Sequence, residues 1–196
     1  MQNVVVWQEV TDALLAGITH ELNGRVSAIT GLLTVVAMGT AAGEALALLV
    51  QEGERLDAAV ALLRGYPRGT RRHEEAIDPR ELLEGLVVLH RQREDVTELS
   101  FGVEVRPGTS AARAERTWLS RALLVLLARA SLAVRGAGGA DVLAYAAGDA
   151  SGVALGVRGP GLEGVSAADA YLVTAGDYAG RAGGQLRDWE IRLPTP

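Results

Sequence analysis

The chain contains neither cysteine nor lysine. Without cysteine it has no disulfide, no thiolate metal ligand and no cysteine nucleophile. All 19 of its basic residues are arginines, so chemistry that needs a lysine amine, such as P-loop phosphate binding or Schiff-base formation, is excluded. The net charge of −5 argues against nucleic acid as a partner.

Signals for export and membrane insertion are also missing. The opening MQNVVVWQEV lacks the basic region of a signal peptide. Glu, Arg or Gly interrupts the apolar segments well short of the roughly 20 residues that a membrane helix needs. Hydrophobic residues make up 48% of the chain and charged residues 22%, which is typical of a globular protein. We therefore expect a soluble, cytoplasmic protein with no membrane partner.

The first third of the chain is predicted to be a helical hairpin. Apolar residues recur every three or four positions over residues 5–38, glycines at 39–43 break the pattern, and residues 44–63 predict a second helix. The short connection favours antiparallel packing. Because one hairpin cannot bury two apolar faces well, we expect two hairpins to form a four-helix bundle in a homodimer. Residues 1–66 are assigned to this dimerisation unit.

The remainder is predicted to be a linker, residues 67–75, and an α+β domain, residues 76–196. Its expected elements are a strand at 76–77, a helix from Pro79 to about Arg93, a strand at 99–105, a helix at 116–134, strands at 141–147 and 153–157, a helix at 167–180, and one or two strands at 184–193. This order predicts helices packed against a mostly antiparallel sheet.

A histidine stands on the polar side of the first predicted helix. With Ile18 at zero on a helical wheel, the apolar stripe from Leu22 to Val36 stays within about 80°, whereas His20 falls at about 200° and should face solvent. Glycine inside a helix costs about 1 kcal/mol relative to alanine, and a docking surface for another protein would explain such a cost. The residues around His20 are mostly small, and we predict that these form the docking surface: Ala13, Ala16, Gly17, Asn23, Gly24, Arg25, Ser27 and Gly31.

His20 has two interpretations on these grounds. It is either an ordinary exposed histidine or a nucleophile, because a neutral imidazole is a good nucleophile at pH 7. In the second case the neighbouring Glu21 would orient the ring or exchange a proton with it. The other histidines, His73 and His90, lie near arginines and are expected to be solvated, so no metal site is predicted.

The stretch HELNGRVSAI, residues 20–29, resembles the phospho-acceptor box of sensor histidine kinases, His-Glu-Leu-Arg-Asn-Pro-Leu-x-x-Ile. Residues 52–60 resemble the second dimerisation helix of that family, and residues 77–83 resemble the entry to its ATP-binding domain. The resemblance covers about residues 10–193. It implies a phospho-acceptor hairpin followed by a reduced, histidine-kinase-type ATPase-like α/β sandwich.

The motifs with which the family binds Mg-ATP are degenerate here. The two asparagine positions of its nucleotide helix hold Val125 and Arg129, and no asparagine occurs after Asn23. Val157 replaces the aspartate of the Asp-x-Gly-x-Gly loop, and only residues 162–169 remain for the lid. We predict a vestigial nucleotide pocket without ATP hydrolysis, autophosphorylation or a cofactor of its own, formed by Arg129, Val157, Gly159, Gly161 and Gly184.

A histidine box beside a degenerate ATP domain resembles the kinase-derived dimeric histidine phosphotransferases. This implies that His20 accepts and donates a phosphoryl group between receiver-domain aspartates, with Mg²⁺ supplied by the receiver. The implied partners are response-regulator receivers and an upstream hybrid kinase. Asn23, Gly24 and Arg25 depart from the family's Arg-Asn-Pro, which leaves open a non-catalytic scaffold, or pseudokinase, that binds a receiver or kinase. An active kinase with an unusual nucleotide site is the third alternative.

Overall fold

The computed structural model describes residues 2–39, 42–67 and 73–194. Residues 40–41 of the predicted turn and 68–72 of the predicted linker lie outside the described residues. The elements follow in this order: α1 (Gln2–Ala37), α2 (Ala42–Gly65), β1 (Glu74–Ile77), α3 (Pro79–His90), η1 (Glu94–Val96), β2 (Ser100–Val105), β3 (Ala112–Glu115), α4 (Arg116–Gly136), β4 (Asp141–Asp149), β5 (Gly152–Arg158), η2 (Leu162–Gly164), α5 (Ala170–Arg181), β6 (Gln185–Arg187) and β7 (Glu190–Leu193).

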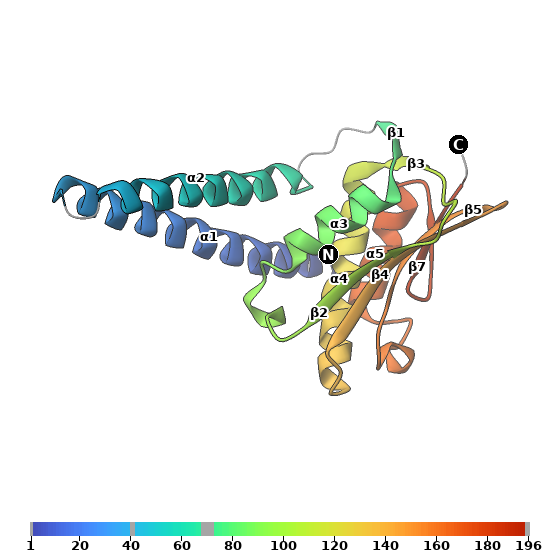
Figure 1. Ribbon diagram of the computed structural model, residues 1–196. Coiled ribbons are helices and arrows are strands. Elements are labelled where there is room, and N and C mark those ends of the chain that lie inside the picture. The colour runs from blue at the N-terminus through green and yellow to red at the C-terminus, as the bar shows by residue number, and fades with distance from the viewer. Residues whose placement is uncertain (1, 40–41, 68–72, 195–196) are drawn as a thin grey trace.

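The helices α1 and α2 form an antiparallel hairpin whose far end projects away from the rest of the molecule (Figure 1). The residues of α2 that are buried recur every seven positions, at Ala45, Glu52 and Ala59. Two of the three are alanines, which let the helices approach closely. Glu52 is a charged residue in this narrow seam, and it needs partners of opposite charge.

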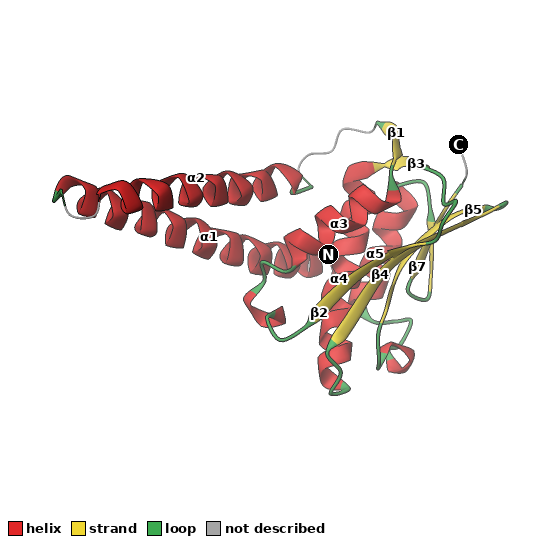
Figure 2. Ribbon diagram, viewed as in Figure 1, coloured by secondary structure: helices red, strands yellow, loops and turns green. Residues whose placement is uncertain are grey.

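The second part of the chain is a sheet covered by helices on one face (Figure 2). Its strand order is β2-β4-β5-β7-β6, with β2 parallel to β4 and the other pairs antiparallel. A separate two-stranded sheet pairs β1 with β3. Asp78 begins α3 as predicted, because its carboxylate accepts hydrogen bonds from the amides of Arg80 and Glu81. The predicted α+β class is confirmed.

The central helix of this layer is α4. It is the one helix among the described residues that is long and apolar enough to cross a membrane by length and composition, but 67% of its apolar window is buried inside the protein. Its leucines, such as Leu119, Leu123 and Leu126, pack between the sheet and the neighbouring helices. The apolar character of α4 is therefore that of a core helix.

The first half of α1 belongs to the same core. Val6, Val10, Leu14 and Ile18, one residue per turn, are all at most 4% exposed and join the hydrophobic cluster of α4 and the sheet. Polar contacts fix the start of the helix as well, because Asn3 donates a hydrogen bond to Asp177 of α5 at 3.2 Å. The hairpin is thus anchored on the second domain along the part of α1 that precedes His20.

Aromatic and cationic side chains hold the root of the hairpin. Trp7 of α1 stacks on Tyr66 at the end of α2 and meets the edge of Tyr178 on α5. The guanidinium of Arg121 lies 5.1 Å from the ring centre of Trp7 and 4.7 Å from that of Trp118. Such contacts each contribute about 0.5–2 kcal/mol, and together they link α1, α2, α4 and α5.

The structure differs from the sequence-based prediction at two places from the end of α3 onwards. The helix ends at His90 rather than near Arg93, and a 3-10 turn, η1, follows. The strand β3, whose sequence ARAE has little apolar alternation, was not predicted. It exists because it pairs with β1, some 40 residues earlier in the chain.

His90 was expected to be solvated, and it is completely buried. Its Nε2 lies 3.0 Å from the Ser131 hydroxyl, which itself donates to the Leu127 carbonyl, so the ring nitrogen acts as the donor. Phe101 packs edge-on against the ring at 5.2 Å. Burial, reinforced by the nearby cation of Arg93, lowers the pKa of His90 to about 3.

This burial predicts a stability that depends on pH. Between pH 6.5 and about 3 the unfolded chain binds a proton at His90 and the folded chain does not, so folding weakens as the pH falls. At pH 5 the loss relative to pH 8 is about 2 kcal/mol. Urea unfolding at both pH values measures it. His90→Gln, which keeps a donor nitrogen, is the control, and an equal slope in that variant would exclude His90 as the cause.

Candidate phospho-acceptor site

His20 lies on α1 just beyond the half that is buried in the domain core, and its side chain is exposed as the helical wheel predicts. Four predicted docking residues on the same side of the helix, Ala16, Gly24, Ser27 and Gly31, are also exposed. A Cβ added at Gly24 or Gly31 would meet no atom within 4 Å. The helix surface beyond His20 therefore has only small side chains, and no other part of the described chain covers it. Asn23 is exposed beside this surface, and Ala13 is partly covered.

Gly17 does not belong to the open surface, and this docking prediction was wrong. The residue is buried, and a Cβ at position 17 would overlap the carbonyl oxygen of Gln92 and lie 2.6 Å from its carbonyl carbon. The glycine is needed because the segment after α3 crosses α1 at this point. The helix-destabilising cost of Gly17 is thus offset by a contact within the chain rather than by a partner.

Glu21 and Arg25 are parts of an ion network that joins the two helices of the hairpin. Arg25 contacts Glu21 at 2.6 Å on its own helix and Glu52 of α2 at 3.1 Å. Arg55 binds the second oxygen of Glu52. Among the described residues no hydrogen bond joins Glu21 to His20, so the expected orienting contact is not present. The guanidinium of Arg25, which was predicted to face a partner, forms ion pairs with these two carboxylates instead.

The network explains the buried carboxylate of Glu52. Burial alone pushes the pKa of Glu52 up, but the hydrogen bonds from Arg25 and Arg55 outweigh burial and hold that pKa below its ordinary value. The carboxylate therefore stays charged in the seam. No role was predicted for Glu52, although its spacing of seven residues from both Ala45 and Ala59 would have placed it between the helices.

The positions aligned with the nucleotide-binding side chains have become part of the core or of an ion pair. Val125 and Val157 are at most 2% exposed. Arg129 binds Asp169 at 2.8 Å, and the same carboxylate caps the start of α5. The charge of this guanidinium is therefore already neutralised by a side chain of the same chain. Asp169 was not singled out from the sequence.

The remaining glycines of the predicted pocket allow close packing of the backbone. A Cβ at Gly159 would lie 2.6 Å from a methyl group of Val134, and one at Gly161 would lie 2.8 Å from the Cβ of Ala137. Gly161 also has a positive φ of 81°. A Cβ at Gly184 would lie 2.7 Å from Leu193. Residues 159–169 span the whole gap from β5 to α5, and they contain the short turn η2.

Solved structures resemble this arrangement, whereas no family model and no curated protein matches the sequence. The histidine kinase AdeS of Acinetobacter baumannii is similar with a TM-score of 0.50 at 16% identity, over 89% of this chain and 97% of that one. A bacterial phosphotransferase is similar over 94% of both chains (TM-score 0.44, 14% identity). The catalytic domain of the histidine kinase ThkA is similar over 64% of this chain and 97% of its own (TM-score 0.47, 16% identity). The chain has a histidine kinase fold.

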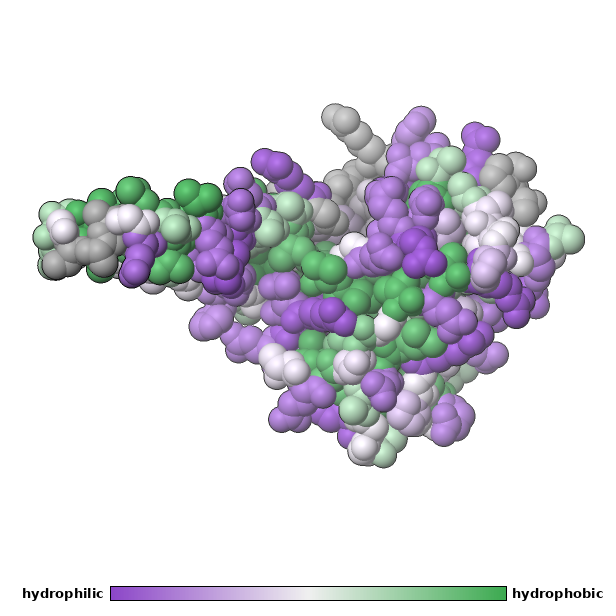
Figure 3. Space-filling view, in the orientation of Figure 1, coloured by the Kyte–Doolittle hydropathy of each residue, from purple (hydrophilic) through white to green (hydrophobic). Residues whose placement is uncertain are grey.

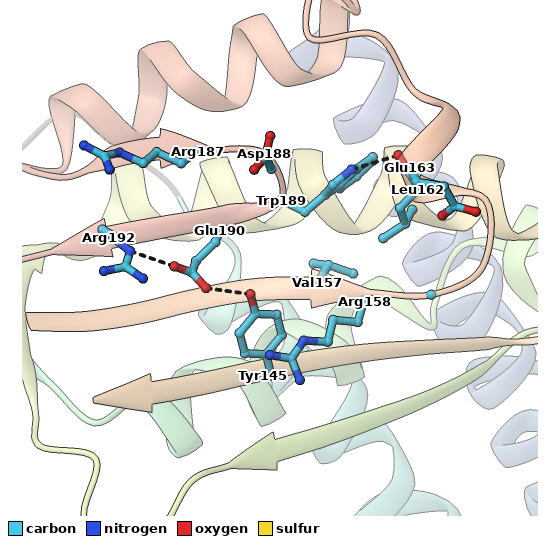
Figure 4. Close-up of a pocket in the computed structure, with 11 residues that line it drawn as sticks. Tyr145, Val157, Arg158, Leu162, Glu163, Arg187, Asp188, Trp189, Glu190 and Arg192 are labelled. Atoms are coloured by element: carbon cyan, nitrogen blue, oxygen red, sulfur yellow. Dashed lines mark hydrogen bonds and ion pairs between the residues drawn. The ribbon is translucent and has the colours of Figure 1, made fainter. Parts of the chain in front are cut away.

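A pocket of about 620 Å³ lies on the face of this histidine kinase fold that the helices leave open (Figure 4). Tyr145, Arg158, Glu190 and Arg192 line it from adjacent strands. Within it Glu190 accepts hydrogen bonds from both Tyr145 and Arg192 at 2.8 Å. Burial and the Glu190 carboxylate raise the pKa of Tyr145 to about 12, so its hydroxyl stays protonated. The pocket does not include His20.

Proposed function

We propose that the protein is a histidine phosphotransferase of a two-component phosphorelay, with His20 as the phosphoryl carrier. One observation carries the proposal: an exposed histidine in a kinase-like box stands on a histidine kinase fold whose nucleotide-contacting positions are core residues and an ion pair. A protein of this kind has the acceptor of a histidine kinase without the means to phosphorylate it. The phosphoryl group must then come from another protein.

The chemistry requires little from the carrier. A ring nitrogen of neutral His20 attacks the phosphorus of an aspartyl phosphate on a receiver domain. The P–N bond forms as the P–O bond to the aspartate breaks, and the carboxylate leaves with the bonding electron pair. The ring then loses its remaining N–H proton to solvent, which reaches the exposed side chain. Attack by an aspartate of a second receiver reverses these steps. The receivers supply the Mg²⁺ that neutralises the phosphoryl oxygens.

The open surface beyond His20 supports this assignment. A helix that delivers an imidazole into the active site of a partner must approach that site without bulky side chains nearby. Gly24, Ser27 and Gly31 leave such room. The anchoring of α1 in the domain core also supports a carrier rather than a kinase, because autophosphorylation would require a nucleotide held by that domain to come within bonding distance of His20.

A homodimer completes the proposal. Large apolar side chains remain exposed over the far half of the hairpin, and Figure 3 shows them gathered there. They include Val26 and Leu33 of α1 and Leu46 and Val50 of α2, each 53–65% exposed. A second hairpin would cover them in a four-helix bundle. We propose this dimer in the cytoplasm, with response-regulator receivers and an upstream hybrid kinase as its partners.

The proposal predicts that Mg-ATP does not bind. The aligned positions offer neither an oxygen ligand for the metal nor a carboxylate for the adenine amino group, and Arg129 already has Asp169 as its partner. Calorimetric titration should find no binding tighter than about 100 µM, which corresponds to about 5.5 kcal/mol. A histidine kinase with intact asparagines serves as the positive control. Tighter binding by this chain would make an active kinase the better assignment.

The direct test is transfer from a phosphorylated receiver. Receiver domains of the source organism are phosphorylated with acetyl phosphate, freed of the donor and mixed with the chain. We expect a phosphate that is labile to acid and stable to base, as phosphohistidine is, and mass spectrometry should locate it at His20. If no receiver transfers phosphate to the chain, or if the label maps to another residue, the proposed carrier role is wrong.

A further inference from the structure

The segment that follows α3, residues 91–98, crosses α1 one turn before His20. Its contact is the carbonyl of Gln92 against Gly17, which has no side chain to keep the two backbones apart. On the helical wheel Gly17 and His20 differ by about 60°. The segment therefore packs on the domain-facing side of α1, about 60° around the helix from the imidazole, and it borders the open surface at its near end.

A docking surface centred on His20 would also include this segment. Even a weak, transient complex buries on the order of 500 Å² per partner, which is a round patch of about 13 Å radius. Helix positions three apart are separated by about 5–6 Å, so Gly17 and the segment lying on it fall well within such a patch. The exposed face of α1 alone is too narrow to provide the whole area.

The segment is held in a fixed conformation. Arg93 makes two parallel hydrogen bonds to Asp95, at 2.9 and 2.8 Å. Arg135 of α4 donates to the carbonyl of Asp95 at 2.6 Å, and Arg91 donates to the carbonyl of Phe101. A surface that is ordered before binding costs little further entropy when a partner arrives. This is the property expected of a docking element.

Two carboxylates of the segment point to the chemistry of the partner. Glu94 and Glu98 are exposed and have no ion-pair partner among the described residues, whereas Asp95 is taken up by Arg93. We propose that residues 91–98 form part of the receiver docking surface and that Glu94 and Glu98 select receivers with arginine or lysine opposite them. This inference rests on the proposed role of His20. Charges at the rim of an interface alter encounter rates and partner choice more than the reaction itself.

The test uses Glu94→Arg and Glu98→Arg in the full chain, with each receiver of the organism as phosphoryl donor. For the receiver that wild-type chain prefers, KM should rise at least tenfold at low salt and less at high salt, while kcat stays within about twofold. Glu104→Arg is the matched control. It makes the same charge change at an exposed position on β2, and it should leave KM unchanged. Binding of each receiver is measured in parallel by fluorescence anisotropy.

The outcomes separate this inference from the proposed function. Transfer with wild-type KM and an unchanged order of receiver preference in both variants would overturn the docking role and leave the phosphotransferase intact. Receivers that bind without transferring phosphate, and bind more weakly to the two variants than to Glu104→Arg, would support the docking surface while refuting the carrier. If no receiver binds, both are wrong.

Discussion

Replacement of His20 by alanine is expected to abolish phosphoryl transfer, with a loss of at least about a thousandfold in rate, because the imidazole nitrogen forms the covalent bond and no neighbouring side chain can replace it. The side chain is exposed, so the free energy of unfolding should change by no more than about 0.5 kcal/mol. Transfer is measured from a phosphorylated receiver, and stability by urea unfolding.

The same variant decides between the carrier and the scaffold. Receiver binding and the oligomeric state should be those of wild type. The substitution changes neither the open helix surface beyond His20 nor the exposed apolar side chains at the far half of the hairpin. His73→Ala is the matched control, because His73 is also exposed but lies before β1, outside the hairpin. If phosphoryl transfer between receivers proceeds at the wild-type rate with His20→Ala, the phosphoryl group does not pass through this residue. The non-catalytic scaffold would then be the correct assignment.

The features that could be predicted from the sequence are those that depend on nearby residues. The exposure of His20 follows from the period of one helix, and the start of α3 follows from Asp78 and Pro79. In each case the residue type and its immediate neighbours determine the outcome.

The features that could not be predicted depend on distant partners. His90 can be buried because Ser131, 41 positions later, accepts a hydrogen bond from its ring N–H, and the sequence around His90, which is rich in arginine, gives no sign of this partner. Glu52 is buried because Arg25, 27 positions earlier, reaches it from the other helix of the hairpin. Arg129 was read only as a lost asparagine, although Asp169 had become its partner. Long-range pairs of this kind have no local pattern.

The anchoring of the first half of α1 in the domain core could not be predicted from the sequence either. Its apolar stripe is continuous with that of the far half, so periodicity alone assigns the whole helix to one bundle. In the structure the stripe changes partner near His20: Val10 and Leu14 are buried in the domain core, while Val26 and Leu33 remain more than half exposed. His20 therefore lies where α1 leaves the domain, which makes its side chain reachable from outside and keeps its position fixed.

Substitution of Gly17 by alanine should destabilise the protein by about 3 kcal/mol or more. The added methyl group would overlap the Gln92 carbonyl. The methyl group is fixed by the backbone of α1, and the carbonyl is fixed by the hydrogen-bonded backbone at the end of α3. Neither can move without loss of the packing around Ile18, so the cost exceeds that of ordinary overpacking. Urea unfolding at neutral pH measures the difference in the free energy of unfolding.

Gly24→Ala is the matched control, on the same helix and within two turns. No atom lies within 4 Å of the added Cβ, and alanine is the better helix former, so this variant should gain up to about 1 kcal/mol. The two substitutions are chemically identical and opposite in expected sign, which removes helix propensity as an explanation. Equal effects would mean that the segment after α3 does not rest on α1, and the docking surface inferred beside His20 would lose its physical basis.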